Sequence, residues 1–134
     1  MSRKSKGSNA EREVLHNFWN NGWACMRAAG SGSIQWPEPD LIAGKGEKLF
    51  VIECKSSADE AKYIEKREVI ELMEFARIME AEPILAIKFN NRKWKFFKPD
   101  EMRETEKSYM VTKEETEIKG RTFEELTENP PKNT

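Results

Sequence analysis

The sequence is poor in residues that bind zinc or form disulfide bonds. It has two cysteines and one histidine in 134 residues, and Cys25 and Cys54 do not form a CxxC pair. A zinc site would therefore have almost no ligands. Each cysteine lies in an apolar, strand-like run, where a buried and reduced thiol is expected. Any metal would have to be held by carboxylates, which favours magnesium, with manganese as a possible substitute.

Long apolar stretches are also missing. No segment approaches the roughly 18 apolar residues of a membrane helix, and the basic start at residues 1–7 is not followed by the apolar run of a signal peptide. We therefore expect a cytoplasmic protein that does not contact membranes. The length suits one domain with its own hydrophobic core. We expect this domain to span residues 1–128, with 1–7 as a flexible basic arm and 129–134 as a disordered tail.

The sequence has no marked excess of charge of one sign, since its formal net charge is −1. By itself, that value argues against a nucleic-acid partner. The charges are unevenly distributed, however: lysine and arginine slightly outnumber acidic residues in 1–100, whereas acidic residues dominate 101–128. This modest excess is weak evidence for DNA binding and decides nothing alone.

The pattern of apolar residues predicts an α/β fold, a mixed central sheet with helices packed against it. Apolar residues recur at three- and four-residue steps in two segments, which predicts helices at 8–21 and 66–80. Strands are predicted at 23–27, 40–43, 49–55, 83–89 and 93–97. A turn at 44–47 joins the second and third strands into a hairpin, and the continuous apolar run at 49–52 indicates a strand covered on both faces. Residues 100–128 are charged and weakly patterned, with a short helix expected at 122–126.

The strongest functional signal lies on this hairpin. Pro39-Asp40 opens one strand, and Glu53-Cys54-Lys55 ends the next. Residues two apart on a strand share a face, so Glu53 and Lys55 point the same way, and Asp40 can lie beside Glu53. Two carboxylates that close repel each other unless a cation lies between them. The arrangement therefore favours a metal site over the alternative, an ordinary pair of charges at the solvent end of a strand.

Glu11 is a further candidate, because it lies along the apolar stripe of the first predicted helix, with Val14, Leu15 and Phe18. A carboxylate on an otherwise buried face needs a partner or a cation. A capping box, with Ser8 as N-cap and Glu11 three residues later, explains the same position equally well. Both interpretations can hold together.

This combination of motifs resembles the PD-(D/E)xK nuclease superfamily: Pro-Asp, then Glu-x-Lys on a hairpin, with a glutamate on an upstream helix. More closely, the chain is similar to the archaeal Holliday junction resolvases and their viral relatives, over roughly residues 3–127. The motif PD-(D/E)xK alone is weak, but the ordered set of shared segments is specific. The set comprises Lys6-Gly7, Ala10 to Glu13, Gly22-Trp23-Ala24, Arg27 to Ser31, Pro39 to Gly44, Ile52 to Lys55, Arg67, Phe75-Ala76-Arg77, Lys95-Phe96-Phe97, Arg103 to Glu106 and Phe123 to Leu126.

The resemblance implies a restriction-endonuclease-like core and an enzyme that introduces paired symmetric nicks into four-way DNA junctions by magnesium-dependent hydrolysis. It implies that Glu11, Asp40 and Glu53 bind magnesium. It also implies that Lys55 orients the attacking water or stabilises developing charge, and that Ser31 lies near the scissile phosphate. This chemistry agrees with the residues, because a divalent cation and a nearby lysine supply the nucleophile and counter-charge that phosphodiester hydrolysis needs.

Several basic residues could contact DNA phosphates, although each could equally be a solvated surface charge. Arg27 has the best claim because it leads into the Ser31 loop, and the basic arm suits binding by counterion release. No aromatic pattern indicates base stacking, which fits recognition of backbone shape. The candidates are Arg3, Lys4, Lys6, Arg12, Arg27, Lys62, Lys66 and Arg67.

A junction has two strands to cut symmetrically, and the resemblance implies a homodimer with two active sites. Ile70, Met73 and Ile78 on the second helix and the strand Trp94–Phe97 could form its interface, although plain core packing is the first interpretation. Other functions remain open: a PD-(D/E)xK nuclease for other branched, nicked or linear DNA, a non-catalytic DNA-binding module, or a structural domain. The intact Asp40, Glu53 and Lys55 count against the binding module.

Overall fold

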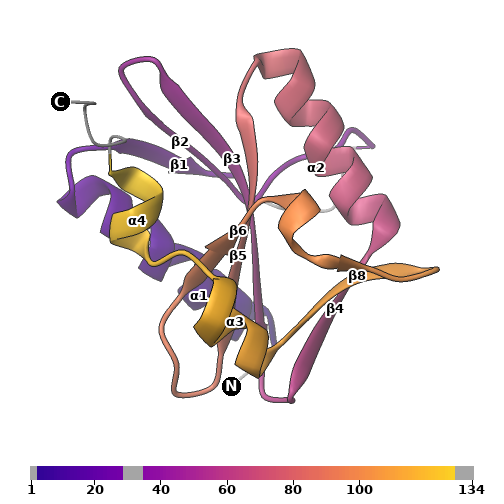
Figure 1. Cartoon of the computed structure of the whole chain (residues 1–134). Coiled ribbons are helices and arrows are strands. Elements are labelled where there is room, and N and C mark those ends of the chain that lie inside the picture. The colour runs from indigo at the N-terminus through magenta and orange to yellow at the C-terminus, as the bar shows by residue number, and fades with distance from the viewer. Residues whose placement is uncertain (1–2, 29–34, 129–134) are drawn as a thin grey trace, which may run out of the picture.

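The computed structural model describes residues 3–28 and 35–128, with the side chains of residue 9 onwards. A five-stranded sheet forms its centre, in the order β1-β2-β3-β5-β6 (Figure 1). β3 and β5 run parallel, and the other neighbours are antiparallel. The predicted mixed sheet and the β2–β3 hairpin are therefore confirmed. The strands are β1 (Ala24–Arg27), β2 (Leu41–Lys45), β3 (Lys48–Ser57), β5 (Glu82–Phe89) and β6 (Lys95–Phe97).

Two long helices cover opposite faces of the sheet, α1 (Arg3–Asn20) and α2 (Lys66–Met79) (Figure 1). Side chains alternate along β3, so Ile52 packs into the α1-side core and Val51 into the α2-side core. Both side chains are fully buried. The apolar run at residues 49–52 thus forms a strand covered on both faces, as predicted.

Helix α1 begins at Arg3, five residues earlier than predicted. Residues 3–7, expected as a flexible arm, are helical, because lysine and arginine are good helix formers and the single Gly7 costs only about 1 kcal/mol. Ser8 therefore lies inside the helix and is not its N-cap, so the capping-box interpretation of Glu11 is wrong. The predicted tail at 129–134 lies outside the described residues.

A second, three-stranded sheet was not predicted. It contains β4 (Ala61–Glu65), β8 (Ser108–Thr112) and β7 (Arg103–Glu104), in that order. Its strands are short and largely half-exposed, so their sequences lack a strong apolar alternation. Ile64 and Val111 are buried and extend the α2-side core. A 3₁₀ turn at Pro99–Glu101 and the helices α3 (Lys113–Lys119) and α4 (Phe123–Thr127) complete the chain, and α4 confirms the short helix expected at 122–126.

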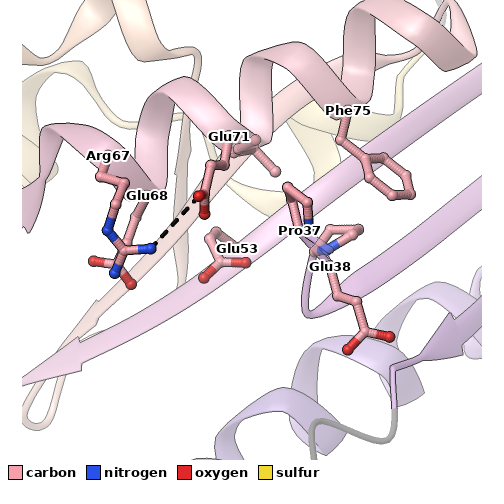
Figure 2. A pocket seen from close by; sticks show the side chains of 9 residues that line it. Pro37, Glu38, Glu53, Arg67, Glu68, Glu71 and Phe75 are labelled. Atoms are coloured by element: carbon pink, nitrogen blue, oxygen red, sulfur yellow. Dashed lines mark hydrogen bonds and ion pairs between the residues drawn. The ribbon is translucent and has the colours of Figure 1, made fainter. Parts of the chain in front are cut away.

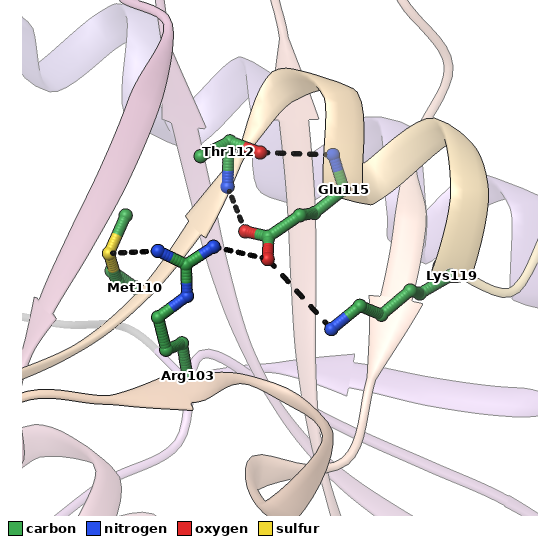
Figure 3. A network of polar contacts seen from close by, with 5 residues as sticks. All are labelled: Arg103, Met110, Thr112, Glu115 and Lys119. Carbon is green, nitrogen blue, oxygen red and sulfur yellow. Dashed lines mark hydrogen bonds and ion pairs between the residues drawn. The ribbon is translucent and has the colours of Figure 1, made fainter.

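A polar network orders the charged C-terminal segment (Figure 3). Thr112 caps α3: its hydroxyl accepts the Glu115 N–H at 3.0 Å, while the Glu115 carboxylate accepts the Thr112 N–H at 2.9 Å. Arg103 on β7 pairs with the same carboxylate at 2.6 Å. At least one acidic residue of 101–128, Glu115, thus accepts hydrogen bonds from residues of the same segment. No helix in the described part of the chain is long and apolar enough to cross a membrane.

Candidate active site

Asp40 and Glu53 lie side by side at one end of the β2–β3 hairpin. Leu41 pairs with Ile52 across the two strands, which brings the preceding and following residues together. The Asp40 N–H donates to Glu53 Oε1 at 3.2 Å, and the Cys54 N–H donates to Asp40 Oδ2 at 2.8 Å. The backbone of each strand therefore fixes the carboxylate of the other.

Burial and mutual repulsion disfavour the charged forms of these two carboxylates. Loss of solvent raises the pKa of Asp40 to about 6, aided by the charge of Glu11 and opposed by the hydrogen bond from Cys54. Burial, and then the charge of Asp40, raises the pKa of Glu53 to about 8. Two adjacent carboxylates with raised pKa values attract a cation, because a cation favours the charged form of both.

Lys55 shares the α2-facing side of β3 with Glu53, as alternation predicted. Its ammonium binds Glu68 Oε1 on α2 at 2.7 Å. Burial alone would lower the pKa of Lys55, but the hydrogen bond to Glu68 and the charges of Glu68, Glu53 and Asp40 outweigh burial and raise it. Lys55 is therefore a charged group at neutral pH, held by the helix that covers the site.

Glu11 does not join Asp40 and Glu53 in this structure. Its carboxylate pairs with Arg27 Nε at 2.9 Å, although its charge still reaches Asp40. Within residues 3–28 and 35–128, no three histidine, cysteine, aspartate or glutamate side chains lie close enough together to hold a metal ion. The structure thus brings together two of the three predicted metal ligands, Asp40 and Glu53. The role of Glu11 as the third ligand stays a prediction.

A hollow of about 200 Å³ opens beside Glu53, between α2 and the segment at residues 37–39. Figure 2 shows Glu53 facing Arg67, Glu68 and Glu71 on the helix, with Pro37 on the other side. Arg67 pairs with Glu71 at 3.5 Å and is largely exposed. Of the predicted DNA contacts, Arg67 therefore borders the candidate site directly.

The other predicted DNA contacts are more dispersed. Arg12 is exposed on α1, next to Glu11. Lys62 is half-buried on β4, and Lys66 pairs with Glu104 at 3.0 Å, so both lie towards the second sheet. Arg3, Lys4 and Lys6 lie in the first two turns of α1, but their side chains are outside the description, and Ser31 lies outside the described residues altogether.

The sequence did not predict Glu68 as a residue of the site. An acidic residue in the first turn of a helix is common, because it interacts favourably with the helix dipole, so nothing singled it out. One signal was available: Glu68 lies four residues before the buried Leu72 and therefore on the face of the helix that turns towards the sheet.

Comparison with known proteins gives consistent matches over nearly the whole chain. The model of the archaeal Holliday junction resolvase family (Hjc) matches residues 2–134. The crossover junction endodeoxyribonuclease Hjc of Archaeoglobus fulgidus is 36% identical over 129 residues, covering 91% of this chain and 95% of that protein. The protein of the same name from Sulfolobus acidocaldarius is 38% identical over 128 residues, covering 94% and 89%.

The fold agrees as well. The solved structure of Archaeoglobus fulgidus Hjc, described as a Holliday junction resolvase from an archaeal hyperthermophile, superposes with a TM-score of 0.82 at 32% identity. The match covers 89% of this chain and 98% of that one. The restriction-endonuclease-like core is thus confirmed, and the chain belongs to the archaeal Holliday junction resolvase family, Hjc.

Proposed function

We propose that this protein is a crossover junction endodeoxyribonuclease that cuts four-way DNA junctions with paired symmetric nicks. The observation that carries the proposal is the Asp40–Glu53 pair with Lys55 beside it, in a chain of the Hjc family. Phosphodiester hydrolysis needs an activated water and positive charge near the transition state. The two carboxylates can hold a cation that activates the water, and the lysine can supply positive charge near the transition state.

A divalent metal is implied by the nuclease family, and we propose Mg²⁺, with Mn²⁺ as a substitute. The pair offers carboxylate oxygens, the ligands that Mg²⁺ prefers. Among the side chains that the structure describes, those of residues 9–28 and 35–128, no lysine or arginine forms an ion pair with Asp40 or Glu53, so the two carboxylates are open to a cation. A bound divalent ion would supply Lewis acidity and lower the pKa of a water molecule. Glu11 is the proposed third ligand.

The chain's own groups have separate tasks in this proposal. Asp40 and Glu53 hold the cation at the hairpin end. Lys55 brings positive charge to the α2 side of the site, where it can stabilise the charge that develops on the phosphate. Arg67 borders the site, and Arg27 pairs with Glu11. In this proposal both arginines contact the DNA backbone, and Ser31 lies near the scissile phosphate.

We also propose a homodimer that acts inside the cell, where junction DNA is found. The outer face of α2 supports it: Ile70 and Ile78 are 55% and 68% exposed, and large apolar side chains in solvent favour an interface. By contrast, the strand Trp94–Phe97, a second candidate for the interface, packs into the core. Two copies related by twofold symmetry would carry two sites for two cuts.

The proposal is tested by incubating the protein with a synthetic four-way junction or a linear duplex of the same sequence, with Mg²⁺. We expect symmetric nicks in the junction alone. Glu53→Gln keeps the shape but loses the charge, and should lower the rate by at least about 100-fold, as expected for loss of a group essential to metal-assisted hydrolysis. Glu47→Gln, an exposed glutamate at the other end of the same hairpin, is the matched control and should cut normally.

Each of the other functions predicts a different result. Cleavage of both substrates would support a PD-(D/E)xK nuclease without junction preference. Junction binding without cleavage by the wild type would support a non-catalytic binding module. A protein that neither binds nor cuts the junction would support the remaining alternative, a structural domain.

A further inference from the structure

We infer that Glu68 is a positioning residue of the active site, which holds the Lys55 ammonium on the α2 side and away from the Asp40–Glu53 pair. The inference deepens the proposed function and rests on it, because it concerns how Lys55 is presented during cleavage. Glu68 acts through Lys55 and needs no contact of its own with the substrate.

The contact is short and partly shielded from solvent. Lys55 Nζ lies 2.7 Å from Glu68 Oε1, and the two side chains are only 22% and 29% exposed. Partial burial strengthens such a pair relative to one on an open surface. Glu68 is itself held in place, since the next residue, Val69, is fully buried and Leu72 is nearly so. A flexible lysine is therefore fastened to a packed helix.

Other carboxylates lie near Lys55. Glu53 lies two residues earlier on the same face of β3, and the Asp40 N–H donates to Glu53 at the end of the hairpin. The charges of both carboxylates favour the charged form of Lys55. Without Glu68, the strongest attraction for the ammonium would be this carboxylate pair. A lysine bound there would occupy the position that a divalent cation needs. Glu68 thus supplies a competing partner that leaves the pair available.

Glu68 could instead serve only to fasten α2 to β3, and rates can distinguish the two roles. We would measure single-turnover cleavage of the four-way junction and, in the absence of Mg²⁺, junction affinity for wild type, Lys55→Ala, Glu68→Ala and the double variant. Misplacement of an active-site group by about 1 Å can cost about 100-fold in rate. We expect Glu68→Ala to lower the rate by between about 10- and 100-fold and to change the junction Kd by less than about 3-fold.

The double variant carries the decisive comparison. If Glu68 acts through Lys55, adding Glu68→Ala to the Lys55→Ala variant lowers the cleavage rate no further. The double variant and Lys55→Ala then cut at equal rates. Glu68→Gln keeps an acceptor oxygen and should retain an intermediate rate. Glu74→Ala is the matched control, because Glu74 forms a similar ion pair on α2, with Arg77 at 2.5 Å, but lies outside the hollow. It should cut like the wild type.

Mn²⁺ binding, followed by electron paramagnetic resonance without DNA, gives a readout independent of activity. We expect Glu68→Ala to weaken Mn²⁺ binding and the double variant to recover it, since the competing ammonium is gone. The inference would be overturned if the rate loss of the double variant equalled the product of the losses of the two single variants. Unchanged Mn²⁺ binding in Glu68→Ala would overturn it as well. A wild-type protein that does not cut the junction would overturn the proposed function instead, and a Lys55→Ala variant that cuts normally would overturn the role of Lys55.

Discussion

At the scale of single residues, the raised pKa values of Asp40 and Glu53 couple proton binding to folding. The folded protein holds protons that the unfolded chain has released at the same pH, because the pKa values rise from near 4 to about 6 and about 8. Stability from this source is fully present below about pH 4 and is lost as pH rises through the folded pKa values.

We therefore predict that, in the presence of EDTA, the Tm falls as the pH is raised from 5 to 9. Mg²⁺ should oppose the fall, because under the proposed function it would bind the two carboxylates in their charged form and so stabilise the folded state. The measurement is a series of thermal unfolding curves with and without Mg²⁺. The double variant Asp40→Asn, Glu53→Gln should show a flatter pH profile and no gain from Mg²⁺. An equal slope in wild type and double variant would contradict the prediction.

The residues of the site differ in how far sequence could place them. Asp40, Glu53 and Lys55 could be placed because a hairpin and the two-residue alternation of strands determine which side chains share a face. The pairs Lys55–Glu68 and Glu11–Arg27 could not, because each joins a strand to a helix. Such pairs depend on the position at which a helix packs on the sheet, and local sequence does not encode it.

At the scale of elements, strongly periodic segments were predicted well and charged ones poorly. The strands of the central sheet and α2 carry apolar patterns that match their burial. The second sheet does not, because its short strands are held by pairing such as Ile64 with Tyr109 and by contacts with α2 and α3. Tertiary packing decides these elements, and propensity alone gives a weak signal for them.

The cap of α3 gives one prediction at this scale. Thr112→Ala removes the hydroxyl that accepts the Glu115 N–H, and loss of such a cap typically costs about 1 kcal/mol. For a domain of this size we expect the Tm to fall by roughly 3 to 6 °C. Glu114→Ala, an exposed substitution in the same turn, should lower it much less. Equal Tm values for both variants would show that the cap adds no stability.

The close approach of Gly120, the residue after α3, to β6 gives another. A Cβ on Gly120 would lie 2.6 Å from the Lys95 Cβ and 2.7 Å from the Thr116 carbonyl oxygen. Gly120→Ala therefore forces these groups apart, and overpacking of this kind costs about 1 to 3 kcal/mol. Urea unfolding should show a lower midpoint with an unchanged m-value. An unchanged midpoint would mean that the C-terminal segment shifts without loss of stability.

At the scale of the whole molecule, the exposed face of α2 is the proposed interface of the homodimer. Replacing Ile78 by lysine places a charge in the proposed apolar interface, which should convert the dimer into monomers, as light scattering coupled to size exclusion would show. Paired nicking of the junction should then give way to single nicks. Ile118→Lys is the control, because Ile118 is 74% exposed on α3, away from that face. A monomeric wild type, or a dimeric Ile78→Lys, would contradict this interface.

The hairpin that carries Asp40 and Glu53 also bears on the order in which the protein assembles. The two residues are 13 positions apart, so closing the loop between them costs little chain entropy, and hairpins form in microseconds. The contact from Lys55 to Glu68 requires α2 to dock against the sheet and should form later. We therefore expect the carboxylate pair to exist in partly folded chains, where the proposed divalent ion would already find two of its ligands and act as a template for the remaining structure.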